Sequence, residues 1–272
     1  MKITIFFLAN LLAYESYGQD MFAEKPLFVN DQKLLPVLWQ QHAAEYRALC
    51  YQAFNIAALR LQEALRSKKR KPAIITDLDE TILDNSYNEA QLVKDGKGYS
   101  AASWKQWTDL SAATAVPGAV DFLRLAKKKG VSIFYISNRN TAEVESTLLN
   151  LKKLQLPDAD TAHMLFLSTS SSKESRRLAV MNKYNVIMLL GDNLNDFTQA
   201  FEKGSVSNRF RETDKAREWW GKKFIVLPNT TYGEWENALN NYQRNLSRHQ
   251  RDSLYRQWLQ GAQNVFERKK LL

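Results

Sequence analysis

The sequence has few of the residues from which several common kinds of site are built. Among its 272 residues there are one cysteine, Cys50, and three histidines. A single cysteine cannot form an internal disulfide bond. One cysteine and scattered histidines also fail to supply the paired ligands of a catalytic zinc site. No histidine stands in an Arg-His-Gly sequence, which excludes the phosphatases built on that motif; the three are His42, His163 and His249.

Long apolar runs are equally scarce, and the clearest lies at the N-terminus. The run ITIFFLANLLA, residues 3–13, follows a lysine and precedes small or turn-forming residues up to Gly18. Its length and flanks predict a signal peptide over 1–18, cleaved before Gln19 and too short to span a bilayer. No cysteine follows the run, so a lipoprotein anchor is not expected. Export without disulfide bonds favours a periplasmic or secreted bacterial protein with no transmembrane span; the alternative is a buried N-terminal strand or helix.

The composition is that of an ordinary globular protein, with 44% hydrophobic and 25% charged residues. Lysine and arginine number 38 against 29 acidic residues, which gives a formal net charge of +9. Such a surface attracts anions, including phosphates, nucleotides and anionic membranes. No motif that reads nucleic acid is recognisable, so nucleic acid is not an expected partner.

One acidic turn stands out from this background. The apolar residues 73–76 predict a strand buried on both faces, and the next residues include Asp77, Asp79 and Glu80. Like charges this close repel unless a cation neutralises them. In a parallel sheet, ligands bind at the carboxyl ends of the strands. Asp77 and Asp79 therefore suggest a site for a hard divalent cation, most naturally Mg²⁺; the alternative is an acidic turn after a core strand.

Strand and helix patterns alternate along the chain. Apolar segments predict further strands at 131–136, 164–167, 186–190 and 224–227. Amphipathic periodicity predicts one long helix or two abutting ones over 34–67, and helices over 119–129, 141–154 and 173–184. Asn140 and Glu143 form a variant of the capping box at the start of helix 141–154. This alternation predicts an α/β fold with a doubly wound, Rossmann-like parallel sheet.

The same patterns divide the chain into segments. After the signal peptide, residues 19–71 are expected to form an N-terminal helical accessory segment. Residues 72–242 form the core, and residues 82–116 within it are expected to be a small, α-rich cap over the mouth of the sheet. Residues 243–272 are expected to form a basic C-terminal helix.

Polar groups follow three of the predicted strands. They are Asp77 and Asp79, then Ser137 and Asn138, then Asp192 and Asp196, while Lys173 begins the helix before the last of these strands. In a doubly wound sheet these strand ends meet at one edge. Together they offer a carboxylate nucleophile, a neighbouring acid, phosphate-binding donors and a cation site, which is what phosphoryl transfer requires.

These residues resemble the four motifs of the haloacid dehalogenase superfamily, and more closely the class C acid phosphatases, a family of secreted bacterial enzymes. The similar stretches, spread between about Leu34 and Tyr242, are ITDLDETILDNS (75–86), AVPGA (115–119), SNR (137–139), GDNLNDF (191–197) and LPNTTYGEW (227–235). The resemblance implies a Mg²⁺-dependent acid phosphatase on a haloacid dehalogenase fold.

The resemblance also implies a role for each residue. Asp77 is expected to attack phosphorus and form an aspartyl-phosphate, and Asp79 to serve as general acid and then base. The implied Mg²⁺ site uses the Asp77 and Asp192 carboxylates, the Asp79 carbonyl and, through a water, Asp196. The groups expected to hold the phosphoryl group are Ser137, Asn138 and Lys173.

The expected substrate is a small phosphomonoester, most of all a nucleoside 5′-monophosphate, as for a 5′-nucleotidase. The resemblance implies contacts with it from Leu83, Trp104 and Tyr232; alternatively, Trp104, Trp107 and Trp235 form only a hydrophobic core for the cap. Two other functions stay open: hydrolysis of other phosphomonoesters such as sugar phosphates or phosphotyrosine, and a non-catalytic binding or storage protein on the same fold. A homodimer also stays open.

Overall fold

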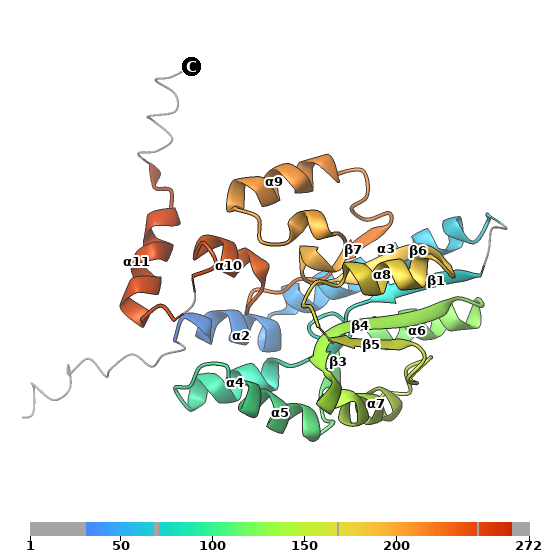
Figure 1. The fold of residues 1–272 in the computed structure, drawn as a ribbon, viewed down its shortest axis with the longest axis horizontal. Helices are drawn as coiled ribbons and strands as arrows, with labels where there is room; N and C mark the ends of the chain where they lie inside the picture. The colour runs from blue at the N-terminus through green and yellow to red at the C-terminus, as the bar shows by residue number, and fades with distance from the viewer. Residues whose placement is uncertain (1–30, 68–70, 168, 244, 263–272) are drawn as a thin grey trace, which may run out of the picture.

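The computed structural model describes residues 31–67, 71–167, 169–243 and 245–262, so the expected signal peptide lies outside the described residues. A five-stranded parallel sheet lies between helices (Figure 1). Its order is β5 (Met164–Leu167), β4 (Ser132–Asn140), β1 (Pro72–Thr76), β6 (Asn185–Gly191) and β7 (Phe224–Val226). The predicted α/β class and parallel sheet are confirmed.

Strand β1 lies at the centre of the sheet, and the chain reverses its direction of winding there. It first adds β4 and β5 on one side of β1 and then returns to add β6 and β7 on the other. The ladder continues past the end of β1, because the backbone N–H of Asp77 donates to the carbonyl of Leu190 over 3.0 Å. Ligands bind at such switch points in open α/β sheets, so the fold places Asp77 where a site is expected.

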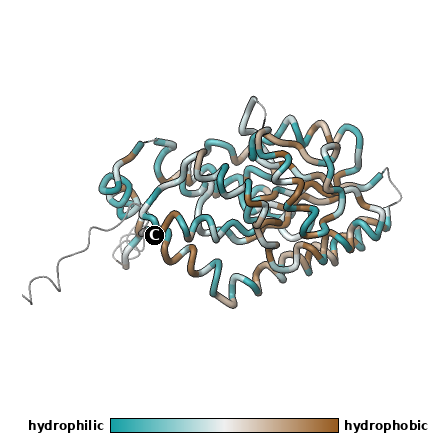
Figure 2. Tube along the Cα trace, turned by 90° about the horizontal axis from the view of Figure 1, so that it is seen from below, coloured by the Kyte–Doolittle hydropathy of each residue, from teal (hydrophilic) through white to brown (hydrophobic). Residues whose placement is uncertain are grey.

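The two faces of the sheet bury separate hydrophobic clusters, because successive side chains of a strand point to opposite faces. In β1, Ile74 packs toward helices α3 (Ala44–Ala64), α6 (Ala119–Lys128) and α7 (Val144–Lys153). Ala73 and Ile75 pack on the other side, toward helix α8 (Glu174–Met181). Figure 2 shows many of the brown, hydrophobic stretches of the chain in the interior of the molecule, with teal, hydrophilic stretches around them.

Of the two N-terminal helices, the second, α3, packs directly on the sheet and the first lies beside α4 (Ser86–Lys94). Helix α2 (Leu34–His42) follows a short turn, η1 (Asp31–Lys33), and Ala43, with extended backbone, separates α2 from α3. This confirms the alternative of two abutting helices. Cys50, Ala57 and Leu61 of α3 are at most 1% exposed. Helix α3, from the expected accessory segment, is therefore part of the cover of one face of the sheet.

The insertion 82–116 is α-rich, as predicted. It contains β2 (Leu83–Asp84), α4 (Ser86–Lys94), α5 (Ala101–Asp109) and β3 (Thr114–Ala115), and the two short strands pair antiparallel at its base. Helix α5 begins with a capping box in which Ser100 and Ser103 bond each other's backbone N–H groups. In Figure 1, α4 and α5 lie together beside α2 and α7, which they contact.

Strand β4 is longer than predicted, which is a correction to the expected end at residue 136. The register of β4 against β5 shifts after Ile136, and Asn140 still pairs with Leu167. Ser137 and Asn138 therefore lie within the strand. The expected capping box of Asn140 and Glu143 is present, at the start of η2 (Thr141–Glu143), directly before α7.

Helices and turns complete the second half of the chain. They are η3 (Leu194–Asp196), η4 (Gln199–Phe201), α9 (Val206–Lys215), α10 (Glu234–Leu239) and the basic helix α11 (Arg248–Trp258). Within the described ranges, no helix combines the length and apolar character needed to cross a bilayer.

Replacing Asn150 of α7 should destabilise the fold. Its side chain accepts from the backbone N–H of Ala113 (3.0 Å) and donates to the Ala113 carbonyl (2.9 Å), and all these groups are buried. Asn150→Leu leaves both backbone groups unpaired, so the free energy of unfolding should fall by about 2–4 kcal/mol. Urea denaturation measures the change. The matched variant Asn182→Leu, at an exposed position, should change stability by less than about 0.5 kcal/mol.

Candidate active site

Three carboxylates meet at the switch point. Asp77 follows β1, Asp192 follows β6 and Asp196 ends η3, and one oxygen of each lies within 4.8 Å of the others. Strands separated by more than a hundred residues thus deliver like charges to one place. Such an arrangement persists only where cations balance it.

One cation is part of the protein. The Nζ of Lys173, the residue directly before α8, lies 2.6 Å from Asp77 Oδ1 and 2.6 Å from Asp196 Oδ1. Burial disfavours its charge, but Asp196 and Asp77 outweigh that effect and raise the pKa of Lys173, so the ammonium stays charged. The structure therefore brings Lys173 into the site with the predicted carboxylates.

Burial and the neighbouring negative charges raise the pKa values of two of these carboxylates. Burial raises the pKa of Asp77 well above its usual value, although Lys173 opposes the shift. Burial, followed by the charge of Asp196, raises the pKa of Asp192 to about 7. Three carboxylates face one ammonium, and their oxygens are hard ligands, so the cluster fits a divalent cation.

Neighbouring groups hold two of these carboxylates in place. Asp192 accepts hydrogen bonds from Asn229 Nδ2 (2.8 Å) and Thr81 Oγ1 (3.1 Å). Asp196 Oδ2 accepts from a backbone N–H of its own turn, that of Asn193, over 3.0 Å. Gly191 makes the approach possible, because a Cβ at this position would lie 2.4 Å from the Asp196 Cβ.

The Asp79 carboxylate lies outside the three-carboxylate cluster and is bound by different residues. Two nitrogens of Arg139, Nε and Nη2, form an ion pair with it, and Nη2 lies 2.7 Å from Oδ1. Asn85 Nδ2 donates to Oδ1 over 2.9 Å and Ser137 Oγ to Oδ2 over 3.3 Å. The side chain is thus fixed beside the cluster, and the structure does not add its carboxylate to the candidate metal ligands.

The turn after Asp79 connects the site to the last loop. Glu80 has a left-handed backbone (φ 57°), and its N–H bonds the carbonyl of Leu83 at 2.8 Å. The buried Glu80 carboxylate accepts from the Asn85 backbone N–H (2.9 Å) and from the Tyr232 hydroxyl. Burial, then the charge of Asp79, raises the pKa of Glu80 well above its usual value.

The second motif supplies one cavity residue and one buried residue. Asn138 is exposed and lines the cavity; its amide donates to the Ser171 carbonyl (2.9 Å) and accepts from Arg176 (2.6 Å). Ser137 is 1% exposed, and its hydroxyl contacts Asp79 and the N–H of Arg139. Both therefore lie at the site, Ser137 as a partner of Asp79.

A cavity of about 450 Å³ opens over these groups. Trp104 of α5 and Tyr232 of the last loop line it, and Lys33 of η1 joins them. Arg139 lies over the Trp104 ring (5.5 Å to the centroid) and Lys33 over the Tyr232 ring (5.7 Å). The insertion, the last loop and the N-terminal turn thus each supply a wall.

The expected substrate contact of Leu83 is wrong in this structure. Its side chain is 0% exposed in the hydrophobic core, because the turn folds inward and its N–H bonds the carbonyl of Leu78 at 2.8 Å. Trp107 also packs on the core and donates to Asn85 at 2.8 Å, and Trp235 donates to the Tyr232 carbonyl at 3.2 Å. These two tryptophans support the site.

Several residues of the site carry no role in the sequence-based interpretation. They are Lys33, Glu80, Asn85, Arg139 and Asn229. Arg139 directly follows the Ser137-Asn138 pair, and Glu80 directly follows Asp79. Proximity to a motif was therefore the one available signal, and it does not reveal which side chain turns toward the site.

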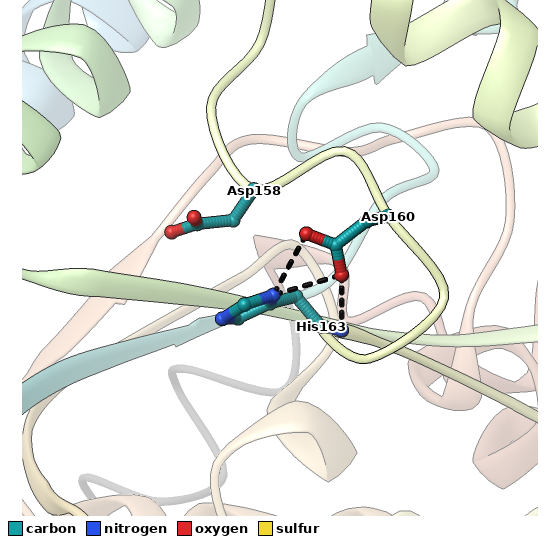
Figure 3. A group of neighbouring side chains, drawn as sticks. All are labelled: Asp158, Asp160 and His163. Carbon is teal, nitrogen blue, oxygen red and sulfur yellow. Dashed lines mark hydrogen bonds and ion pairs between the residues drawn. The ribbon is translucent and has the colours of Figure 1, made fainter.

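A second group with metal-ligating side chains lies elsewhere, at Asp158, Asp160 and His163 (Figure 3). His163 Nδ1 contacts Asp160 at 2.9 Å, and Asp158 pairs with Lys127 (2.5 Å) and accepts from the N–H of Ile133 (2.9 Å). The carboxylates are satisfied within the protein, so this group is a turn that joins α7 to β5.

Comparison with known proteins agrees with the geometry. A model of the family described as HAD superfamily, subfamily IIIB (acid phosphatase), matches residues 28–235. The chain belongs to this family. Two solved structures of the class C acid phosphatase from Bacillus anthracis, one with tungstate bound, are each 40% identical to it with a TM-score of 0.82. They cover 86% and 85% of this chain and 98% of their own lengths. As an acid phosphatase of this family, the chain is a phosphomonoester hydrolase.

Asp192→Asn should stabilise the phosphatase when a chelator removes divalent cations. The folded-state pKa of about 7 exceeds the value of about 3.9 in an unfolded chain, so ionising Asp192 penalises folding as pH rises through this interval. At about pH 8 the free energy of unfolding of the variant should exceed that of wild type by on the order of 2 kcal/mol. The difference should vanish toward about pH 4. Denaturation in EDTA at both pH values tests this, and equal stability at the higher pH would contradict the repulsion.

Proposed function

We propose that this acid phosphatase is an exported, Mg²⁺-dependent enzyme that hydrolyses nucleoside 5′-monophosphates through an aspartyl-phosphate on Asp77. The observation that carries the proposal is the placement of Asp77. It stands at the switch point, borders the cavity, and shares Lys173 with a second carboxylate at 2.6 Å.

In the first step a carboxylate oxygen of Asp77 attacks phosphorus as the bond to the substrate oxygen breaks. Lys173, beside Asp77, lies where it can balance charge on the phosphoryl oxygens. Asp79 gives its proton to the departing alkoxide and itself becomes a carboxylate. The products are an alcohol and the aspartyl-phosphate of Asp77, an acyl phosphate.

In the second step a water molecule attacks phosphorus and the bond to the Asp77 oxygen breaks. Asp79, now ionised, takes the proton of that water. Phosphate leaves, and both aspartates return to their starting states. Asn138, with its amide at the cavity wall, is a donor for the phosphoryl oxygens in both steps.

The candidate metal site uses the carboxylates of Asp77 and Asp192, with Asp196 as their neighbour. Magnesium prefers oxygen ligands and often retains several waters, which suits a cluster of this kind at an open cavity. When bound, Mg²⁺ neutralises charge on the nucleophile and on the phosphoryl group.

Aromatic side chains support a nucleoside as the leaving group. Trp104 and Tyr232 both line the cavity that holds Asp77. A base stacked on such rings gains about 1–3 kcal/mol per stack and needs no sequence-specific hydrogen bonds. The tungstate bound by the relative from Bacillus anthracis is a tetrahedral oxyanion, like the phosphate of this substrate class. Export rests on the expected signal peptide, residues 1–18.

Asp77→Asn should abolish turnover without unfolding the protein. The amide keeps the shape of the side chain but is a poor nucleophile, so kcat should fall by at least about 10³-fold, or about 4 kcal/mol in barrier. Chelation should abolish wild-type activity, and added Mg²⁺ should restore it. The matched variant Asp121→Asn, at an exposed position of α6, should retain full activity. Turnover retained by Asp77→Asn would contradict the nucleophile.

Trp104→Ala should lower the preference for nucleotides. The ratio of kcat/KM for a nucleoside 5′-monophosphate to kcat/KM for glycerol phosphate should fall about 5- to 100-fold, because only the nucleotide loses a stacking partner. Steady-state kinetics with both substrates measure the ratio. Trp258→Ala, an exposed tryptophan of α11, is the matched control and should leave the ratio unchanged. An unchanged ratio for Trp104→Ala would leave the tryptophan as part of the cap core.

A further inference from the structure

We infer that Arg139 is the positioning residue of the general acid: its guanidinium fixes the orientation of the Asp79 carboxyl toward the leaving group. The inference rests on the proposed function, in which Asp79 is the acid. It concerns an arginine that the proposed chemistry itself does not use.

The contact between the two side chains is a fork. The Arg139 Nε lies 3.1 Å from Oδ1 and 3.2 Å from Oδ2 of Asp79, and the Arg139 Nη2 lies 2.7 Å from Oδ1. A guanidinium held this way fixes the plane of the carboxyl as well as its distance, because two nitrogens bond one rigid group. A lysine would supply charge without that constraint.

The arginine is itself held from behind. It is 3% exposed, and its Nη1 donates to Thr147 Oγ1 of α7 over 3.0 Å. Its backbone belongs to the part of β4 that continues beyond the register shift. Trp104 covers the guanidinium, with 5.5 Å between the ring centroid and Cζ. Arg139 is therefore itself held in place and supports the Asp79 carboxyl.

The two oxygens of Asp79 are not equivalent. Oδ1 accepts three hydrogen bonds, from Arg139 Nη2 at 2.7 Å, Asn85 Nδ2 at 2.9 Å and Arg139 Nε at 3.1 Å. Oδ2 receives two longer contacts, from Arg139 Nε at 3.2 Å and Ser137 Oγ at 3.3 Å. Oδ1 is therefore the oxygen that anchors the carboxyl, and Oδ2 is the less tightly held one.

The experiment compares substrates that need the acid to different degrees. An alkyl phosphate has a poor leaving group and depends on protonation, whereas 4-nitrophenolate leaves with little help. In Arg139→Met, kcat/KM should fall about 10- to 100-fold more for glycerol phosphate than for 4-nitrophenyl phosphate. Arg139→Lys, which keeps charge without the fork, should show the same selective loss to a smaller degree. The parameter kcat/KM is used because it reports steps up to departure of the leaving group.

Three controls separate positioning from general damage. Asp79→Asn should show the same selective loss, and adding Arg139→Met to it should cause no further selective loss, because both act through one group. Asn150→Leu loosens the same helix, α7, at a residue that does not contact Asp79. This variant should change kcat/KM for the two substrates by the same factor. Equal losses for both substrates in Arg139→Met, or a selective loss that persists in the Asp79→Asn background, would overturn the inference.

The two proposals fail in different ways. If Asp77→Asn keeps its activity, the aspartyl-phosphate mechanism is wrong whatever Arg139 does. If Asp77→Asn is inactive and Arg139→Met loses both substrates alike, the mechanism stands and only the positioning role is overturned.

Discussion

The ammonium of Lys173 between Asp77 and Asp196, at 2.6 Å from each, is the contact on which the site depends. It allows carboxylates from two separate strand ends to approach in a buried place. Without a cation the same residues would repel one another, because burial weakens the screening of like charges. The phosphatase therefore keeps a permanent cation beside its candidate divalent-cation site.

The architecture around this contact divides the labour of positioning. The central strand β1 and its neighbour β6 bring the carboxylates in from the sheet, and the start of α8 brings the ammonium in from one face. The opposite face carries α3, α6 and α7, which pack against the sheet, and α7 supports Arg139 through Thr147. The surroundings of Asp77 thus come from one face of the sheet and those of Asp79 partly from the other.

Much of this could be predicted from the sequence, because topology leaves few choices. A parallel sheet brings all strand ends to one edge, so Asp77, Asp192 and Asp196 had to meet there once the strands were recognised. Two features escaped prediction for physical reasons. The continuation of β4 past its apolar run depends on pairing with β5, a tertiary effect that propensity does not record. Leu83 beside the nucleophile turn was expected at the substrate, but backbone bonds to Leu78 turn it inward.

The cavity draws its walls from both ends of the described chain: Lys33 precedes the first long helices, whereas Tyr232 and Glu234 follow the last strand. A polypeptide that emerges from the ribosome in order thus contains Asp77 long before it contains the residues of the last loop. The cavity is complete only once Tyr232 lies beside Lys33. Partially made or C-terminally clipped molecules would carry the aspartates and still lack a complete binding chamber.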